Sequence, residues 1–353
     1  MMSYKKKLVT TGLVLAAVLI TSVCGMAGQK LDWSMTTVYM NSHPTVVNAW
    51  QPWTKEMAKL TDGQVNITYC NPNTLTPLKD HYDSTISGMI GIGGNDIGRN
   101  AGKFNLSTVM ELPGLAPSAE CGSLVYWDIY NKFPALQKEF KEVKILWMWA
   151  SATFQLHTTK KPVKNRDDLK GLKIICWNRS SVDIMKSLGA NAIMIPPTDS
   201  YLALERGMAD GILCPLAPVV SFKISEAVKF TTVCDIFVTG FWAAMSHDLW
   251  KSLSPKIQKA FTDTTGAVMA KKSGVTLDQG AARDSKKLKK NGHTFIVLSD
   301  KERNSWLDAT KPLREKWVKA MEKKGYKNPR ALMKEAFSLS AKYAKITGRG
   351  FEQ

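Results

Sequence analysis

The sequence lacks the local motifs on which the common enzyme classes depend. It contains no HExxH zinc motif, no GxSxG nucleophile elbow and no GxxxxGK[ST] phosphate loop. Histidine is scarce, at five residues, and no two histidines lie within four positions of each other. Cysteine is scarce too, and no two cysteines have the spacing of a CxxC pair or a zinc site. We therefore expect no catalytic constellation, no metal and no cofactor, and the chain is not predicted to be an enzyme.

Long hydrophobic runs are also missing, apart from one near the N-terminus. Three lysines, at positions 5–7, precede an apolar run over residues 8–23, and small residues follow at positions 25 and 27. This pattern predicts that residues 1–27 are a signal peptide, cleaved near Ala27, and that the protein is exported to the periplasm. The run is short for a membrane span, which needs ~20 residues. Lipoprotein cleavage before Cys24 is an alternative that the bulky Val23 disfavours.

Acidic residues are few, with 30 Asp and Glu against 48 Lys and Arg and a net charge of +18. The basic residues are spread along the chain and interrupted by acids, as in Lys301-Glu302-Arg303. That spread is typical of solvated helix faces and argues against a nucleic-acid partner. We expect the positive field to raise the local concentration of anionic solutes.

Five cysteines follow the predicted signal peptide, an odd number that leaves at least one thiol unpaired within the chain. They are Cys70, Cys121, Cys176, Cys214 and Cys234. We expect most of them to be small buried apolar residues. Cys70 and Cys121 are the only candidates for a disulfide.

The apolar pattern predicts alternating strands and helices. Residues 30–39 and 65–69 are predicted strands that flank a helix. The apolar residues of that helix fall on one face at Val46, Trp50, Trp53, Met57 and Leu60. Further strands are predicted around residues 143–148 and 172–176, with a glycine-rich connection at residues 91–96. Strand, helix and strand in succession indicate a parallel α/β layer.

The chain is longer than a single hydrophobic core usually supports, so two lobes are expected. Helical periodicity extends from Ser254 to about Asn291. A helix of that length would overrun one compact lobe, and we therefore expect it to span both lobes.

The middle of the chain resembles the solute-binding subunits of tripartite ATP-independent periplasmic (TRAP) transporters, of the dicarboxylate-binding type. The matching runs are TTKKPV at 158–163, DDLKGLKI at 167–174, LGA at 188–190, YLALERG at 201–207 and ADG at 209–211. Shorter matches lie on both sides, so the resemblance covers nearly all of the chain after residue 27.

The resemblance implies a two-lobed α/β periplasmic-binding-protein fold, with a hinge, an interlobe ligand cleft and a long helix shared by the lobes. The expected first lobe comprises residues 28–151 and 240–279, and the second comprises residues 152–239 and 280–353. The implied function is capture of a small organic solute and delivery to TRAP-type membrane permease subunits, driven by an ion gradient. We expect a monomer. A sensor-type binding protein that docks on a receptor is the alternative.

The chain departs from the family at two polar positions. Family members usually carry an arginine that clamps the ligand's carboxylate where this sequence has Ile175, and many carry Glu-Asn-Pro where it has Leu213, Cys214 and Pro215. Isoleucine cannot pair with a carboxylate, so the usual clamp cannot operate unchanged.

Two explanations of this departure stay open. Either Arg179 or Lys173 replaces the missing charge and the ligand is an anion, which the basic surface favours. Alternatively, the ligand presents an aromatic, apolar or cationic group to Trp177, Trp149 and Trp242, with Asp96 as a counter-charge. Other residues expected at the cleft are Gln155, Tyr201, Cys214 and Cys176. The last two thiols are predicted to be reachable by thiol reagents.

Overall fold

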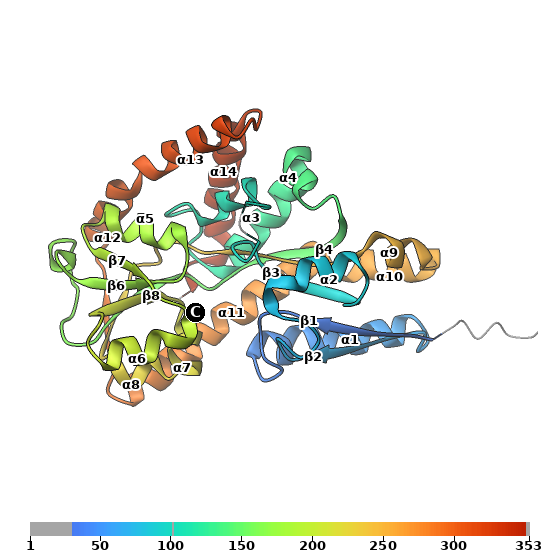
Figure 1. Ribbon diagram of the computed structural model, residues 1–353, viewed down its shortest axis with the longest axis horizontal. Helices are drawn as coiled ribbons and strands as arrows, with labels where there is room; N and C mark the ends of the chain where they lie inside the picture. Colours follow the sequence, from blue (N-terminus) through green and yellow to red (C-terminus); the bar gives the residue numbers. More distant parts are fainter. Residues whose placement is uncertain (1–29, 101, 351–353) are drawn as a thin grey trace, which may run out of the picture.

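The computed structural model describes residues 30–100 and 102–350. These residues form two α/β lobes, each built on one sheet, which lie side by side in Figure 1. The predicted signal peptide lies outside the described residues. Within the described chain, no helix combines the length and the apolar character needed to cross a membrane. The two-lobed α/β architecture expected from the sequence is confirmed.

The first lobe contains a five-stranded sheet in the order β2-β1-β3-β10-β4. Its strands are β1 (Leu31–Thr36), β2 (Val65–Cys70), β3 (Ile92–Asp96), β4 (Val143–Ala150) and β10 (Gly240–Ser246). The first three run parallel, whereas β10 runs antiparallel to both of its neighbours, β3 and β4. The strand that comes last in the sequence therefore lies between two earlier ones.

Helices cover both faces of this sheet and build a core on each side. They are a π-helix (Val46–Trp50), α1 (Gln51–Leu60), α2 (His81–Ile86), a 3₁₀ helix (Leu106–Glu111), α3 (Ala119–Lys132), α4 (Pro134–Glu139), α9 (His247–Ser252) and α10 (Pro255–Thr264). The predicted apolar face of residues 46–60 is confirmed for Val46, Trp50, Trp53 and Met57, which are buried. Leu60, in the last turn, is 44% exposed.

Residues 92–96 of the glycine-rich segment form the strand β3, so the expectation of a connection there was wrong. The glycines are needed because neighbouring elements pack directly on this strand. A Cβ on Gly93 would collide with Thr85 Oγ1, and one on Gly94 would lie 2.9 Å from Thr37 Cγ2 and 2.9 Å from the carbonyl oxygen of Trp242. Glycine in a strand interior often marks such a close approach.

The second lobe contains a six-stranded sheet in the order β11-β9-β5-β8-β6-β7. Its strands are β5 (Gln155–Thr158), β6 (Lys173–Cys176), β7 (Asn191–Met194), β8 (Gly211–Cys214), β9 (Phe230–Val233) and β11 (Thr294–Val297). Its helices are α5 (Arg179–Ser187), α6 (Ser200–Glu205), α7 (Leu216–Ser221), α8 (Ile224–Ala227) and α12 (Asp300–Thr310), with 3₁₀ turns at Asp167–Leu169 and Pro197–Asp199. β5 runs antiparallel to both β8 and β9.

The helix α11 (Ala267–Lys290) connects the lobes. Met269 and Leu277 pack into the core of the first lobe, whereas Ala281 and Leu288 pack into that of the second. The expected helix that spans both lobes is therefore confirmed, but it does not begin at residue 254. Gly266, with φ 58°, separates it from α10, and the Gly266 amide donates to the carbonyl of Leu146 at 2.8 Å.

Two short segments also cross between the lobes, at residues 151–154 and 234–239. They run together, because the amides of Ser151 and Phe154 donate to the carbonyls of Thr239 and Phe237, each at 2.9 Å. Their paired backbones form the hinge segments between the sheets.

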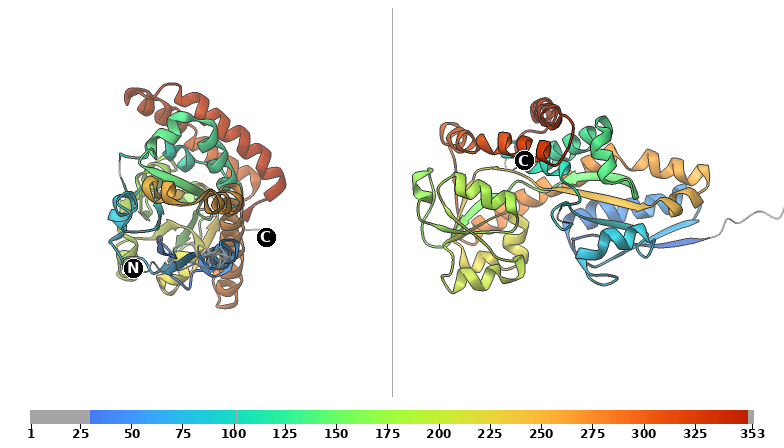
Figure 2. Two further views of the ribbon diagram at one scale, coloured as in Figure 1. Left: turned by 90° about the vertical axis from the view of Figure 1, so that its right-hand side faces the viewer. Right: turned by 45° about the horizontal axis from the view of Figure 1, so that its top comes forward.

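The C-terminal helices α13 (Pro312–Lys323) and α14 (Pro329–Thr347) return to the first lobe (Figure 2). Leu332 and Ala336 are buried in the core that contains α3, and the Trp317 indole donates to Thr108 Oγ1 at 2.8 Å. The boundaries predicted from the sequence assigned all of residues 280–353 to the second lobe. They did not anticipate that α13 and α14 pack on the first lobe.

Candidate ligand-binding site

The carboxyl ends of parallel strands from both lobes meet the hinge segments. In the first lobe these are the ends of β1 and β3, together with the start of β10. In the second lobe, β8 is antiparallel to β5, which begins just after the hinge, so β8 and its parallel neighbour β6 end beside the hinge. Ligands of open α/β sheets bind beyond the carboxyl ends of the strands. The candidate site therefore lies at these strand ends.

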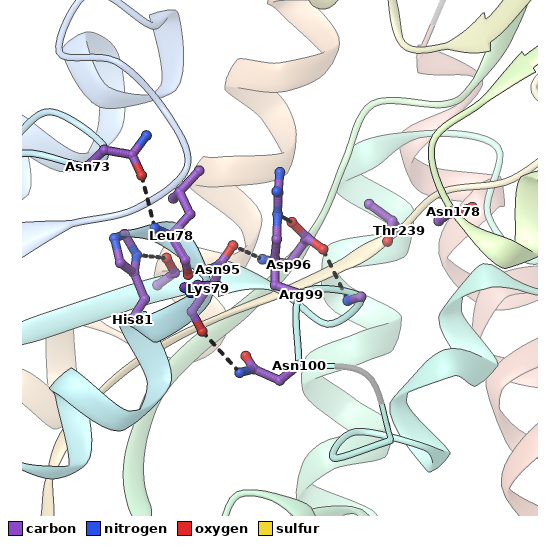
Figure 3. A network of polar contacts seen from close by, with 12 residues as sticks. Asn73, Leu78, Lys79, His81, Asn95, Asp96, Arg99, Asn100, Asn178 and Thr239 are labelled. Carbon is purple, nitrogen blue, oxygen red and sulfur yellow. Dashed lines mark hydrogen bonds and ion pairs between the residues drawn. The ribbon is translucent and has the colours of Figure 1, made fainter. Parts of the chain in front are cut away.

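Asp96 ends β3 and pairs with Arg99, a residue that was not among those predicted from the sequence. The Arg99 Nε donates to Asp96 Oδ2 at 2.9 Å, and the Gly98 amide donates to Asp96 Oδ1 at 3.1 Å. In Figure 3, Thr239 of the hinge and Asn178 of the second lobe lie on the side of Asp96 away from His81. Asp96 thus lies at the strand ends of the candidate site, already paired with Arg99. Its position at the end of a strand is the signal that would have identified both residues.

Aromatic rings lie on the neighbouring strand ends. Phe241 is the register partner of both Asp96 and Trp149, and its ring stacks on that of Trp149 with centroids 5.2 Å apart. The half-buried Tyr39, after β1, lies 5.9 Å from Phe241 between ring centroids. Trp149 itself has no exposed surface, so its ring is not available at these strand ends.

Trp242 lies on the opposite face of β10, because successive strand residues point to opposite sides. Its ring packs edge-on against Tyr82, with centroids 5.3 Å apart, and it has no exposed surface. The structure therefore places this predicted site residue inside the first lobe's core.

The side chain of Gln155 hydrogen-bonds to residues of the hinge. Its Oε1 accepts from the amides of Cys234 and Asp235 at 2.8 and 3.0 Å, and its Nε2 donates to Asp235 Oδ1 at 2.7 Å. Asp235 is fully buried, and Arg349 from the C-terminal segment pairs with its other oxygen at 2.6 Å. The Gln155 amide is therefore occupied by structural hydrogen bonds.

Ile175 and Cys214 are fully buried, in one apolar cluster of the second lobe. Trp177, which follows β6, is half-buried and donates from its indole nitrogen to Ser200 Oγ at 3.0 Å. Of these three residues, Trp177 alone brings part of its side chain to the surface at the strand end.

The two basic residues that could replace the missing arginine clamp lie at different places in the second lobe. Lys173 is at the amino end of β6, opposite the end beside the hinge, so its expected role at the site was wrong. Arg179 begins α5, with its side chain 78% exposed and its Nε 3.3 Å from Asp183 Oδ1. Tyr201 is on α6, where its hydroxyl hydrogen-bonds Glu205 at 3.0 Å.

Glu111 is a buried carboxyl group that joins the lobes and that the sequence did not reveal. It accepts from Thr239 Oγ1 at 2.6 Å in the hinge, and from Ser180 Oγ at 2.5 Å and Asn178 Nδ2 at 3.4 Å in the second lobe. Burial raises the pKa of Glu111, the hydroxyl donors oppose that change, and the negative charge of Asp96 adds to it.

The cysteines contradict two expectations. All five cysteines of the described chain are free, so the proposed Cys70–Cys121 pair is not formed. Cys176 and Cys214 have no exposed surface, and burial raises the pKa of Cys176 to about 12. The prediction that thiol reagents reach them was therefore wrong. Across the described residues, no group of His, Cys, Asp and Glu side chains is arranged to hold a metal ion.

Two α/β lobes, joined by paired hinge segments and a shared helix, with charged and aromatic residues at the strand ends, define a two-lobed solute-binding protein. A model of the bacterial extracellular solute-binding proteins, family 7 (DctP), matches residues 35–321. The chain therefore belongs to this family, whose members are solute-binding transport proteins.

Individual relatives agree with this assignment. The 2,3-diketo-L-gulonate-binding periplasmic protein of Escherichia coli K12 is 24% identical over 312 residues, covering 86% of this chain and 92% of the relative. A TRAP solute-binding protein from Rhodoferax ferrireducens, solved with copurified benzoate, superimposes with a TM-score of 0.82 at 23% identity, covering 90% of this chain and 100% of the other. An open complex from Desulfovibrio salexigens gives 0.81 at 28% identity, covering 92% and 100%.

Proposed function

We propose that this chain is the periplasmic solute-binding subunit of a TRAP-type transporter, which captures a small organic acid between its lobes and delivers it to membrane permease subunits. The proposal includes a monomeric protein without catalytic activity, released by cleavage near Ala27. The observation that carries it is the arrangement of the two sheets, whose strand ends meet at the paired hinge segments.

The relatives indicate the class of solute. The Escherichia coli relative is named for binding 2,3-diketo-L-gulonate, and the Rhodoferax ferrireducens structure contains benzoate. Both molecules are carboxylates. The net charge of +18 suits the capture of anions, because a positive field increases their rate of association.

A ligand screen tests the proposal. The protein lacking residues 1–27 is heated with a panel of carboxylic acids, sulfonates, amines and neutral aromatic compounds. A carboxylate present at about 100 times its Kd should raise the Tm by roughly 5 °C, because it binds the folded state alone. Amines and neutral compounds should leave the Tm unchanged. If no acid raises the Tm, the proposed function is wrong.

Small-angle scattering then tests capture between the lobes. A solute that contacts both lobes shifts the population toward a closed form, because only contacts that differ between the two forms can move the equilibrium. The radius of gyration should therefore fall at saturating acid, while the scattering mass stays that of a monomer. An unchanged radius with bound acid would place the solute on one lobe only.

A further inference from the structure

The guanidinium of Arg99 is oriented by one hydrogen bond, and the side chain is partly exposed. Its Nε donates to Asp96 Oδ2 at 2.9 Å, and the arginine side chain is 42% exposed. Its two Nη groups have no hydrogen-bond partner among the described residues. Asp96 is itself fixed by the amide of Gly98. The result is a pair of parallel N–H donors, held in place at the end of β3.

Such a pair of donors matches the two oxygens of one carboxylate. Arginine binds carboxylates through two parallel charge-assisted hydrogen bonds, and a planar guanidinium that is already oriented loses less entropy when it does so. Because Nε is occupied by Asp96, the free carboxylate of a solute would bind end-on, through both Nη groups of Arg99.

The second lobe offers an apolar surface in place of a second charge. Ile175 is buried in the core, and the Trp177 indole N–H is committed to Ser200, which leaves the ring as the contact surface. Arg179 begins α5, and its exposed guanidinium is paired with Asp183 of the same helix.

Charge and shape together favour one carboxylate on an aromatic body. A second carboxylate bound close to Arg99 would meet the negative charge of Asp96, which is unfavourable. On the first lobe, the apolar contacts beside Asp96 come from its register partner Phe241, which is 7% exposed, and from the half-buried Tyr39, whose ring lies 5.9 Å from that of Phe241. Aromatic rings stack on such contacts favourably.

We propose that Arg99 is the residue that clamps the carboxylate of the solute, from the first lobe, and that the solute is an aromatic monocarboxylate whose ring lies toward Trp177. This assignment rests on the proposed function and replaces the clamp lost at Ile175. Asp96 is the positioning residue for the guanidinium.

Calorimetry with four probes tests the assignment. The probes are benzoate, its neutral analogue benzamide, and the dicarboxylates terephthalate and succinate. Benzoate should bind the unmodified protein at least about 10 times more tightly than each of the other three. Arg99→Gln should weaken benzoate binding by at least about 30-fold, as expected when one member of a charged pair is lost. Arg179→Gln is the matched control and should change the affinity by less than about twofold.

Two further variants separate the roles. Asp96→Asn should weaken benzoate by about 3–10-fold, because the guanidinium is less firmly oriented, and Trp177→Ala should weaken it by about 10-fold through lost stacking. The unliganded Tm of each variant shows that it is folded.

Different results would contradict the proposed function, the Arg99 clamp and the aromatic solute. Binding of no acid in the ligand screen refutes the proposed function itself. Binding of an acid with an unaffected Arg99→Gln and a weakened Arg179→Gln refutes the clamp alone and assigns it to Arg179. Tighter binding of succinate or terephthalate than of benzoate refutes the aromatic monocarboxylate.

Discussion

At the scale of single residues, buried carboxyl groups are the charges that the fold controls most strongly. Glu139 accepts from the amides of Leu106 and Ser107 at 2.5 and 3.0 Å, and from Ser107 Oγ at 2.8 Å. Burial nevertheless raises the pKa of Glu139 to about 7, despite these donors. The neutral form is therefore favoured in the folded state relative to the unfolded chain.

The pH dependence of stability follows from this shift. Because the folded pKa of Glu139 is above its unfolded value of about 4.3, the stabilisation is complete below pH ~4 and is lost as the pH rises to 7. The loss should be on the order of 3 kcal/mol. Urea unfolding at pH 5 and pH 8 measures it, with Glu139→Gln as the comparison, because the variant removes this one ionisation. Equal pH dependence in both proteins would contradict the assigned pKa.

The structure places some of the predicted site residues at the strand ends and others in the core, for a physical reason. Trp177 directly follows β6, which apolar patterning predicted as a strand, whereas Asp96 ends β3, which was not predicted as a strand. Trp149 and Trp242 were expected at the ligand because large rings often stack on solutes, yet this sheet needs large apolar side chains on both faces. Arg99 was missed because β3 was taken for a connection.

At the scale of elements, the joint between α11 and α3 depends on two residues one turn apart. Gly274 faces the first turn of α3, where an added Cβ would collide with Glu120 Cα. Asp278 accepts from the amides of Ala119 and Glu120, each at 2.9 Å, and so satisfies amides at the start of α3. The periodicity of the sequence predicts the helix but carries no sign of this close contact, since it depends on a partner more than a hundred residues away.

Two glycines of α11 should therefore respond oppositely to the same substitution. Gly274→Ala should destabilise the protein by about 2–4 kcal/mol, because the backbone of α3 must move. Gly280→Ala should stabilise it by about 0.5–1 kcal/mol, because the nearest atom to an added Cβ is 3.8 Å away and alanine is the better helix former. Denaturant unfolding of both variants measures the difference, and a shared sign would refute the contact.

At the scale of the whole molecule, three features tie the lobes together beside the hinge. They are the shared helix α11, the Glu111 contacts with Ser180 and Thr239, and the pairing of Arg349 with the buried Asp235. The two lobes and the shared helix could be predicted from length, periodicity and the family resemblance. The two polar contacts could not be predicted, because each joins residues that are distant in the sequence and whose types alone do not indicate a contact.

Removing the C-terminal tie should destabilise the molecule. Arg349→Ala leaves Asp235 buried with only its neutral donors, and we expect a loss of roughly 2–4 kcal/mol in the free energy of unfolding. Arg330→Ala is the control, because its ion pair with Glu315 is about 40% exposed on each side and should contribute less than about 1 kcal/mol. Adding Asp235→Asn to Arg349→Ala should recover part of the loss. Equal effects of the two arginine variants would show that the Asp235 pair is not a structural tie.

The strand order of the first lobe also governs when that lobe can fold. β3 and β4 are not neighbours, and the edge that each presents to the other is filled by β10, which ends at Ser246. A chain that is made N-terminus first therefore carries two unpaired strand edges until about a hundred residues beyond β4 have followed. The first sheet can therefore be completed only after β10 is available to pair with both strands.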